Sequence, residues 1–288
     1  MSAKPIVAAT DGSEESLRAV DWAAREAVLR GAPLRIVSAA GLLPRMVTSE
    51  GHSDYQTVSD AIRSDSDMAL ATAAARAAKI APDLLIDTDH LDGAPAEAVT
   101  ASGSGALMLV VGSRGVGEFT AMVLGSVSRY AATHASGPVV VVRDEIAAAR
   151  RQIGIGISDV ESNAAALTFA FEEAAVRQAS VVAVHAWHAP RSDISRAGTV
   201  LAPASRDFLQ TEATRYLENL LDEWRDKYPD VPVSHDVVQG HPGRTLVGLS
   251  ARTDLLVLGR HHAHHGPGAV THAVLNHAHG PVVTVPSS

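Results

Sequence analysis

The sequence repeats itself, and this repeat constrains the fold more than any other feature. A shift of 147 residues superposes matching pairs, among them Glu14 on Glu161, Ala23 on Ala170, Gly93 on Gly240 and Gly112 on Gly259. The register holds without a net gap up to Gly112. Because self-similarity at a fixed period indicates repeated structural units, the chain is predicted to hold two copies of one domain.

Beyond Gly112 the same comparison needs a shift of 143 residues, which places Gly125 on Gly268, His134 on His277 and Gly137 on Gly280. The second copy is therefore four residues shorter in one loop. The charged, alanine-rich stretch 144–150 suits a linker between the copies. We predict one domain over residues 1–146 and a second over 147–288, and a chain of 288 residues is long enough for both.

Within each copy, segments typical of strands alternate with segments typical of helices. In the first copy, strands are expected near 5–10, 34–39, 84–90, 106–111 and 138–142, and helices near 14–30, 57–81, 95–102 and 120–135. Continuously apolar strands such as 107–111 are typical of a parallel sheet covered on both faces. The sequence thus predicts an α/β protein with two tandem, doubly wound, five-stranded parallel sheets of the Rossmann-like kind, with helices on both faces.

The last strand of each copy is apolar and has no following crossover helix. Such an edge is prone to aggregation unless it is paired, so we expect the final strands to pair with each other or with another chain.

Composition excludes several classes of partner. The chain has 24 basic and 32 acidic residues, a net charge of −8 and few aromatic residues, which disfavours nucleic acid and anionic membranes. It has no cysteine, and so no disulfide or thiolate site. No signal-peptide core precedes the first strand, and no apolar run approaches the roughly 18 residues of a membrane span. We expect a cytoplasmic protein.

A glycine-rich loop follows the fourth strand of the first copy. It reads Gly112-Ser113-Arg114-Gly115-Val116-Gly117, and the next helix is expected to start around Gly125-Ser126-Val127. Glycines let the backbone approach a phosphate, and a helix start adds free N–H groups, a positive dipole end and the Ser126 hydroxyl. Asp11, at the end of the first strand, would face this loop across the crevice. Glycine turns and Gly-Ser helix caps also occur without a ligand, so the loop alone leaves phosphate binding open.

The combined pattern resembles the universal stress protein family. The resemblance rests on Thr10-Asp11-Gly12-Ser13, on Gly112-x2-Gly115-x9-Gly125-Ser126 and on the closing Gly137-Pro138 followed by four valines, and it covers essentially the whole chain. The tandem arrangement of the two copies is similar to that of the two-domain members of the family. The resemblance implies a five-stranded parallel sheet that binds ATP, with or without Mg²⁺.

The resemblance also implies roles for single residues. Asp11 would hold the adenosine part with Ala9 close by, and Ala39 would offer backbone groups to adenine. Gly112, Ser113, Arg114, Gly115, Val116 and Gly117 would wrap the ribose and phosphates, and Gly125, Ser126 and Val127 would hold the phosphate tail. Two departures are Ala9, where the family often has glycine, and Ser38, where it often has histidine.

The second copy departs further at the same site. Ser158 stands at the position of Asp11, His262 at that of Gly115 and Ala269 at that of Ser126, and the loop between them is shortened. We therefore expect the second copy to bind nucleotide weakly or not at all, and to serve structure or pairing.

These features predict an ATP-binding stress-response regulatory protein that is not an enzyme, forms a homodimer and acts on an unknown regulatory protein partner. A slow ATPase and a nucleotide-free dimerisation scaffold are alternatives. A metal binder built on the His-rich loop 261–265 is a third, although an incidental surface loop is favoured because the tract holds no carboxylate or thiolate.

Overall fold

A computed structural model describes residues 3–39, 41, 52–115, 124–143, 149–158, 160–187, 203–260 and 268–287. The chain divides into two compact units, Met1–Glu145 and Ile146–Ser288. The first holds β1 (Ile6–Ala9), α1 (Glu14–Arg30), β2 (Leu34–Ala39), α2 (His52–Ile80), β3 (Ile86–Leu91), α3 (Pro95–Ser102), β4 (Met108–Gly112), α4 (Ser126–His134) and β5 (Val139–Val142). The second holds β6 (Gln152–Ile157), α5 (Val160–Arg177), β7 (Ser180–Trp187), α7 (Pro203–Lys227), β8 (Val233–Gln239), α8 (Pro242–Ser250), β9 (Leu255–Arg260), α9 (Ala269–His277) and β10 (Val282–Pro286).

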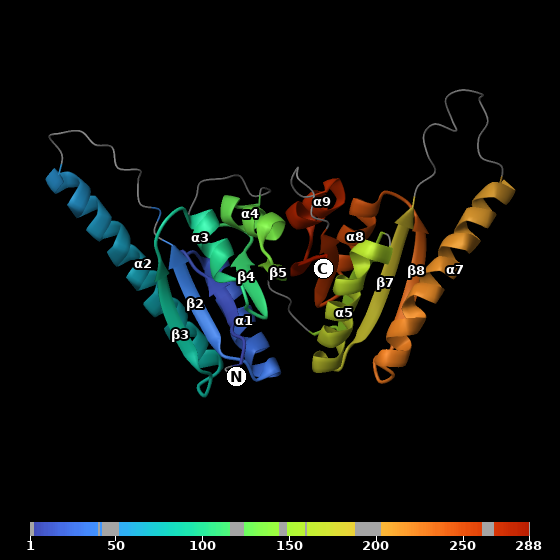
Figure 1. The fold of residues 1–288 in the computed structure, drawn as a ribbon, viewed down its shortest axis with the longest axis horizontal. Helices are drawn as coiled ribbons and strands as arrows, with labels where there is room; N and C mark the ends of the chain where they lie inside the picture. The colour runs from blue at the N-terminus through green and yellow to red at the C-terminus, as the bar shows by residue number, and fades with distance from the viewer. Residues whose placement is uncertain are drawn as a thin grey trace, which may run out of the picture. The chain divides into compact units, whose positions relative to one another are not determined.

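The strands of the first unit form a parallel sheet in the order β3-β2-β1-β4-β5 (Figure 1). The chain winds outward from β1 to β3 and then returns to the other side of β1 for β4 and β5. The strand order therefore reverses between β1 and β4, and a crevice opens outside the carboxyl ends of these two strands.

Helices cover both faces of this sheet. The helices α1 and α2 pack together on one face, and α3 and α4 pack together on the other. Every residue of β1 and β4 is buried, which explains why these strands are apolar throughout rather than alternating. The predicted fold class is confirmed in both units.

The long helix α2 is fixed to α1 by one arginine. The Nη2 atom of Arg76 lies 2.7 Å from Oδ2 of Asp21 and 3.0 Å from Oε1 of Glu14, both on α1. The methyl group of Ala69 on α2 lies 3.3 Å from where a Cβ on Gly12 would stand. These contacts hold α2 against the turn that follows β1.

The second unit repeats the first in detail. Ile6 pairs with Leu34 and Met108, and the residues 147 positions later, Ile153 with Val181 and Leu255, pair in the same way. The helices α4 and α9 also begin alike, after Gly125 (φ −58°, ψ 152°) and Gly268 (φ −55°, ψ 154°). The internal repeat is therefore a repeat of strand register as well as of sequence.

Two predicted helix boundaries are wrong. The helix expected over 120–135 begins at Ser126, because Gly125 has the extended backbone of a cap, and Leu124 before it is not helical. The helix expected from 57 begins at His52. Within the ranges given above, no helix combines the length and the apolarity needed to cross a membrane.

Candidate functional site

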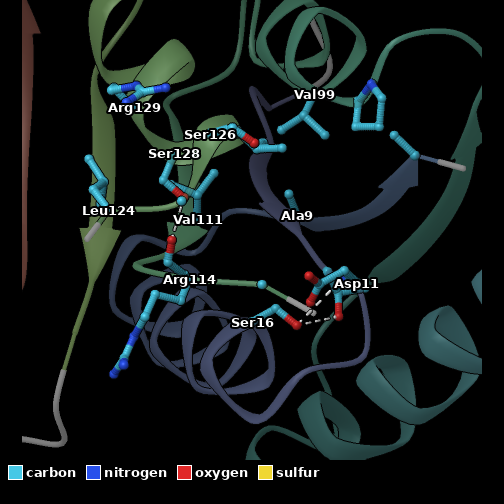
Figure 2. Close-up of a pocket in the computed structure, with 17 residues that line it drawn as sticks. Ala9, Asp11, Ser16, Val99, Val111, Arg114, Leu124, Ser126, Ser128 and Arg129 are labelled. Carbon is cyan, nitrogen blue, oxygen red and sulfur yellow. Dashed lines mark hydrogen bonds between the residues drawn. The ribbon is translucent and has the colours of Figure 1, made fainter. Parts of the chain in front are cut away.

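The switch point of the first unit holds a cavity of about 460 Å³ (Figure 2). Its lining combines strand ends, the loop after β4 and the first turn of α4. The lining residues are Ala9, Thr10, Asp11, Ser16, Ala39, Pro95, Val99, Val111, Gly112, Arg114, Gly115, Leu124, Gly125, Ser126, Val127, Ser128 and Arg129. A cavity of this volume is in the range of small-molecule sites.

Most of the residues predicted from the sequence meet in this cavity. It brings together Ala9, Asp11, Ala39, Gly112, Arg114, Gly115, Gly125, Ser126 and Val127. Ser113 is not in the lining; its side chain is buried, and its carbonyl oxygen accepts a hydrogen bond from the N–H of Gly125 at 2.9 Å. Val116 and Gly117 lie outside the described residues. The ligand roles of all these residues remain predictions.

Asp11 is held by the turn that follows β1. Its Oδ1 accepts hydrogen bonds from the backbone N–H of Ser13 at 3.1 Å and from the Ser13 hydroxyl at 2.6 Å. Ser13 in turn caps α1 through its contact with the N–H of Ser16. Gly12 between them has φ of +82°, a left-handed conformation that glycine adopts without strain. The other carboxylate oxygen of Asp11 faces Gly115.

The loop after β4 depends on close backbone approach. A Cβ on Gly112 would lie 2.8 Å from the carbonyl oxygen of Glu15, so a side chain there would collide with the backbone of α1. The Ser128 hydroxyl donates to the carbonyl oxygen of Gly112 at 2.5 Å and ties α4 to the end of β4. The first turn of α4 is thereby fixed beside the loop, and its free N–H groups form the positive end of the helix dipole.

Two arginines line the cavity, and they differ in their surroundings. The Nη2 atom of Arg114 lies 3.7 Å from Oε1 of Glu15, and Figure 2 shows this side chain running away from Asp11. Its Nε is buried, and no described group accepts a hydrogen bond from it. Arg129 is exposed on the first turns of α4, at the opposite side of the view from Asp11 (Figure 2).

Sequence reasoning missed several of the lining residues. Thr10, Ser16, Pro95, Val99, Val111, Leu124, Ser128 and Arg129 were not predicted. Pro95 and Val99 come from α3, on the sheet face opposite to α1, and only the folded structure brings α3 to the crevice. Arg129 follows Ser126 by three residues, and that spacing places both on one helix face. This spacing was the one sequence signal from which Arg129 could have been predicted to line the site.

The second unit arranges the equivalent positions differently. Gly156, Leu246 and Leu258 stand where the first unit has Ala9, Val99 and Val111. A Cβ on Gly156 would lie 2.8 Å from Cδ1 of Leu246 and 3.3 Å from Cδ2 of Leu258. The two leucine side chains thus lie beside the place where a Cβ at position 156 would stand, which the Ala9 methyl group occupies in the first unit.

A buried arginine also marks the second unit. Arg260 stands at the position of Ser113 and is 7% exposed, and burial lowers its pKa. Ser158, at the position of Asp11, is exposed. The positions of His262 and of the His-rich loop 261–265 lie outside the described residues. Among the residues that are described, no three histidine or carboxylate side chains cluster as metal ligands would.

Comparison with known proteins identifies the family of both domains. The model of the universal stress protein family matches residues 2–143 and again residues 149–286. Universal stress protein MT2052 of Mycobacterium tuberculosis is 31% identical over 306 residues, covering 96% of this chain and 93% of the relative. Universal stress protein Mb2028c of Mycobacterium bovis is 31% identical over 298 residues, covering 98% and 97%.

A solved structure supports the same fold. The crystal structure of a universal stress protein from Archaeoglobus fulgidus has a TM-score of 0.73 and 13% identity, covering all of both chains. At this identity the likeness concerns the fold alone. The family model and the two relatives carry the assignment: the chain belongs to the universal stress protein family and carries two of its domains in tandem.

Proposed function

We propose that the first domain binds ATP in the cavity between β1 and β4, and that the chain is a stress-response regulatory protein whose nucleotide state controls a protein partner. The observation that carries this proposal is the meeting of Asp11, Gly115 and Gly125-Ser126 at one switch point. Ligands of open α/β sheets bind at this place.

The lining chemistry fits a nucleotide. Ala9, Val99 and Val111 form an apolar wall for a base and sugar, and Asp11 offers carboxylate oxygens to ribose hydroxyls. Across the cavity, the glycine backbone, the Ser126 hydroxyl and the start of α4 offer donors to phosphates. These residues would hold ATP, with or without Mg²⁺, in the orientation that the family resemblance implies.

We propose binding rather than catalysis. Efficient phosphoryl transfer needs a positioned base and a well-held metal ion near the terminal phosphate. Asp11 is the one carboxylate among the described lining residues, and it already accepts two hydrogen bonds from Ser13 in the turn after β1. Its proposed role is at the adenosine end. Sustained release of phosphate over many turnovers per minute would contradict this part of the proposal.

The second domain is proposed to serve structure or pairing. The positions of Asp11 and Ser126 are Ser158 and Ala269 there. Leu246 and Leu258 pack close to Gly156 near the end of β6, and we propose that they hinder the entry of a base. A homodimer, pairing of the last strands and a cytoplasmic location belong to the same proposal.

The test is the amount of nucleotide that the purified chain holds after equilibration with ATP. We expect about one ATP per chain, and two would contradict the difference between the domains. None would favour a nucleotide-free scaffold. Asp11→Asn should lower retention strongly. Asp83→Asn, an exposed aspartate in the turn after α2, is the matched control and should leave retention unchanged.

A further inference from the structure

One arginine at the cavity, Arg129, forms no ion pair with any residue that the structure describes. Arg129 lines the cavity with an exposed side chain, and within the part of the chain that the structure describes its guanidinium forms no ion pair. Arg114, the other lining arginine, is directed to Glu15 at 3.7 Å. A guanidinium at the wall of a cavity in a chain of net charge −8 points to an anionic group of a ligand.

The position of Arg129 identifies which part of a nucleotide it would meet. Figure 2 shows Arg129 and Leu124 at one side of the cavity and Asp11 at the other. Arg129 follows Ser126 by one helical turn, and its backbone N–H bonds to the carbonyl oxygen of Gly125 at 2.9 Å. If Asp11 holds the adenosine end, the guanidinium lies at the end reached by the phosphate chain.

The second domain lacks this cation. The residue at the equivalent position is His272, whose ring nitrogens lie 3.3 and 3.4 Å from the side-chain amide nitrogen of Asn276, one turn further along α9. At this position the arginine is therefore found only in the first domain.

We infer that Arg129 makes the site selective for nucleotides with a long phosphate chain, so that ATP and ADP are preferred over AMP and cyclic AMP. The inference rests on the proposed nucleotide site and adds its selectivity. A guanidinium binds phosphate oxygens through two parallel N–H donors, and such charge-assisted hydrogen bonds are about twice as strong as neutral ones. AMP, whose single phosphate would stay near Gly115 in the loop after β4, would not reach it.

The experiment measures dissociation constants for ATP, ADP, AMP and cyclic AMP with the full chain by equilibrium dialysis. In Arg129→Gln we expect ATP affinity to fall about tenfold and AMP affinity to change less than twofold, so that the ATP-to-AMP preference falls about tenfold. Arg129→Lys should keep part of the preference because it keeps the charge. Arg25→Gln, an exposed arginine on α1 that does not line the cavity, is the matched control.

Two results would overturn the inference while leaving the proposed function intact. In the first, ATP and AMP affinities fall by the same factor in Arg129→Gln; in the second, neither changes. Absence of any nucleotide binding by the unmodified chain would overturn the proposed function and the inference together. Because Arg129 is exposed and unpaired among the described residues, the substitution should leave the thermal midpoint within about a degree or two of the parent protein.

Discussion

The carboxylate of Asp11 lies where a side chain on Gly115 would begin. A Cβ built on Gly115 collides with Oδ2 of Asp11, while Oδ1 of the same carboxylate is bound to Ser13. The two residues are 104 positions apart in the sequence, but they meet in the crevice because Asp11 follows β1 and Gly115 follows the neighbouring strand β4. The second domain has replaced both, with Ser158 and His262.

Gly115→Ala should therefore weaken ATP binding through Asp11. The added methyl group must displace a carboxylate whose other oxygen is fixed, and the misplacement should lower ATP affinity about tenfold or more. Equilibrium dialysis measures this. Gly137→Ala is the matched control, because a Cβ at Gly137 meets nothing within 4 Å. An unchanged affinity in Gly115→Ala would show that Asp11 does not contact the ligand.

In the second domain, Gly156→Ala should destabilise the fold by overpacking. The new methyl group would lie 2.8 Å from Cδ1 of Leu246, and overpacking of this kind costs about 1–3 kcal/mol. Leu246→Val in the same chain should restore most of the loss, because it shortens the side chain that collides. Additive effects of the two substitutions would refute this packing account.

Tryptophan fluorescence can follow that unfolding within one domain. The chain has three tryptophans, and a Trp22→Phe background leaves Trp187 and Trp224, both in the second unit. Gly248→Ala, in the helix α8 that also carries Leu246, is the control, since a Cβ there meets nothing within 4 Å. It should stabilise α8 by about 0.5–1 kcal/mol, the usual gain when alanine replaces a helical glycine.

Arg76→Gln should loosen α2 from α1. It removes charge-assisted hydrogen bonds to Asp21 and Glu14, and we expect a loss of about 1–3 kcal/mol in the local stability of α2. Amide hydrogen exchange in α2 is the measurement. Arg63→Gln is the control on the same helix: its 3.8 Å pair with Asp92 is highly exposed and should contribute little.

The Arg76 contact also predicts an acid dependence. The hydrogen bond from Arg76 lowers the pKa of Glu14 below its ordinary value of 4.5. The stabilisation is therefore complete at pH values above 4.5 and is lost as the pH falls through the lowered pKa of the folded state. The difference in thermal midpoint between the parent chain and Glu14→Gln should shrink over that interval. A difference that stays constant down to pH 3 would contradict the assignment.

Much of the first site could be predicted because its parts are local in sequence. The loop from Gly112, the cap at Gly125 and the end of β2 at Ala39 follow from glycine conformation and strand length. For Arg129 the sequence offered only its three-residue spacing from Ser126. A lone arginine on an exposed helix face usually interacts with solvent, and only the position of α4 beside the crevice gives it a cavity to line.

The packing of Leu246 and Leu258 close to Gly156 was also beyond sequence reasoning. The second unit has Leu246 and Leu258 where the first unit has Val99 and Val111, and this difference is conservative on any hydrophobicity scale. Its consequence depends on the missing Cβ of Gly156, to which both leucines turn. The predicted weakness of the second site rests on Ser158, His262 and Ala269, and the close packing at Gly156 is a separate feature of this unit.

Ser126 and Ala269 offer a reciprocal test of the difference between the domains. Ser126→Ala removes a hydroxyl at the start of α4, and loss of one hydrogen bond to a charged phosphate should weaken ATP binding about tenfold. Ala269→Ser places the same hydroxyl at the start of α9, after a glycine cap of nearly the same geometry. We expect no gain in nucleotide per chain, because Leu246 still packs close to Gly156 near the end of β6 and Ser158 offers no carboxylate. A second ATP bound by Ala269→Ser would mean that the hydroxyl alone separates the two domains, and not Leu246 or the missing carboxylate at Ser158.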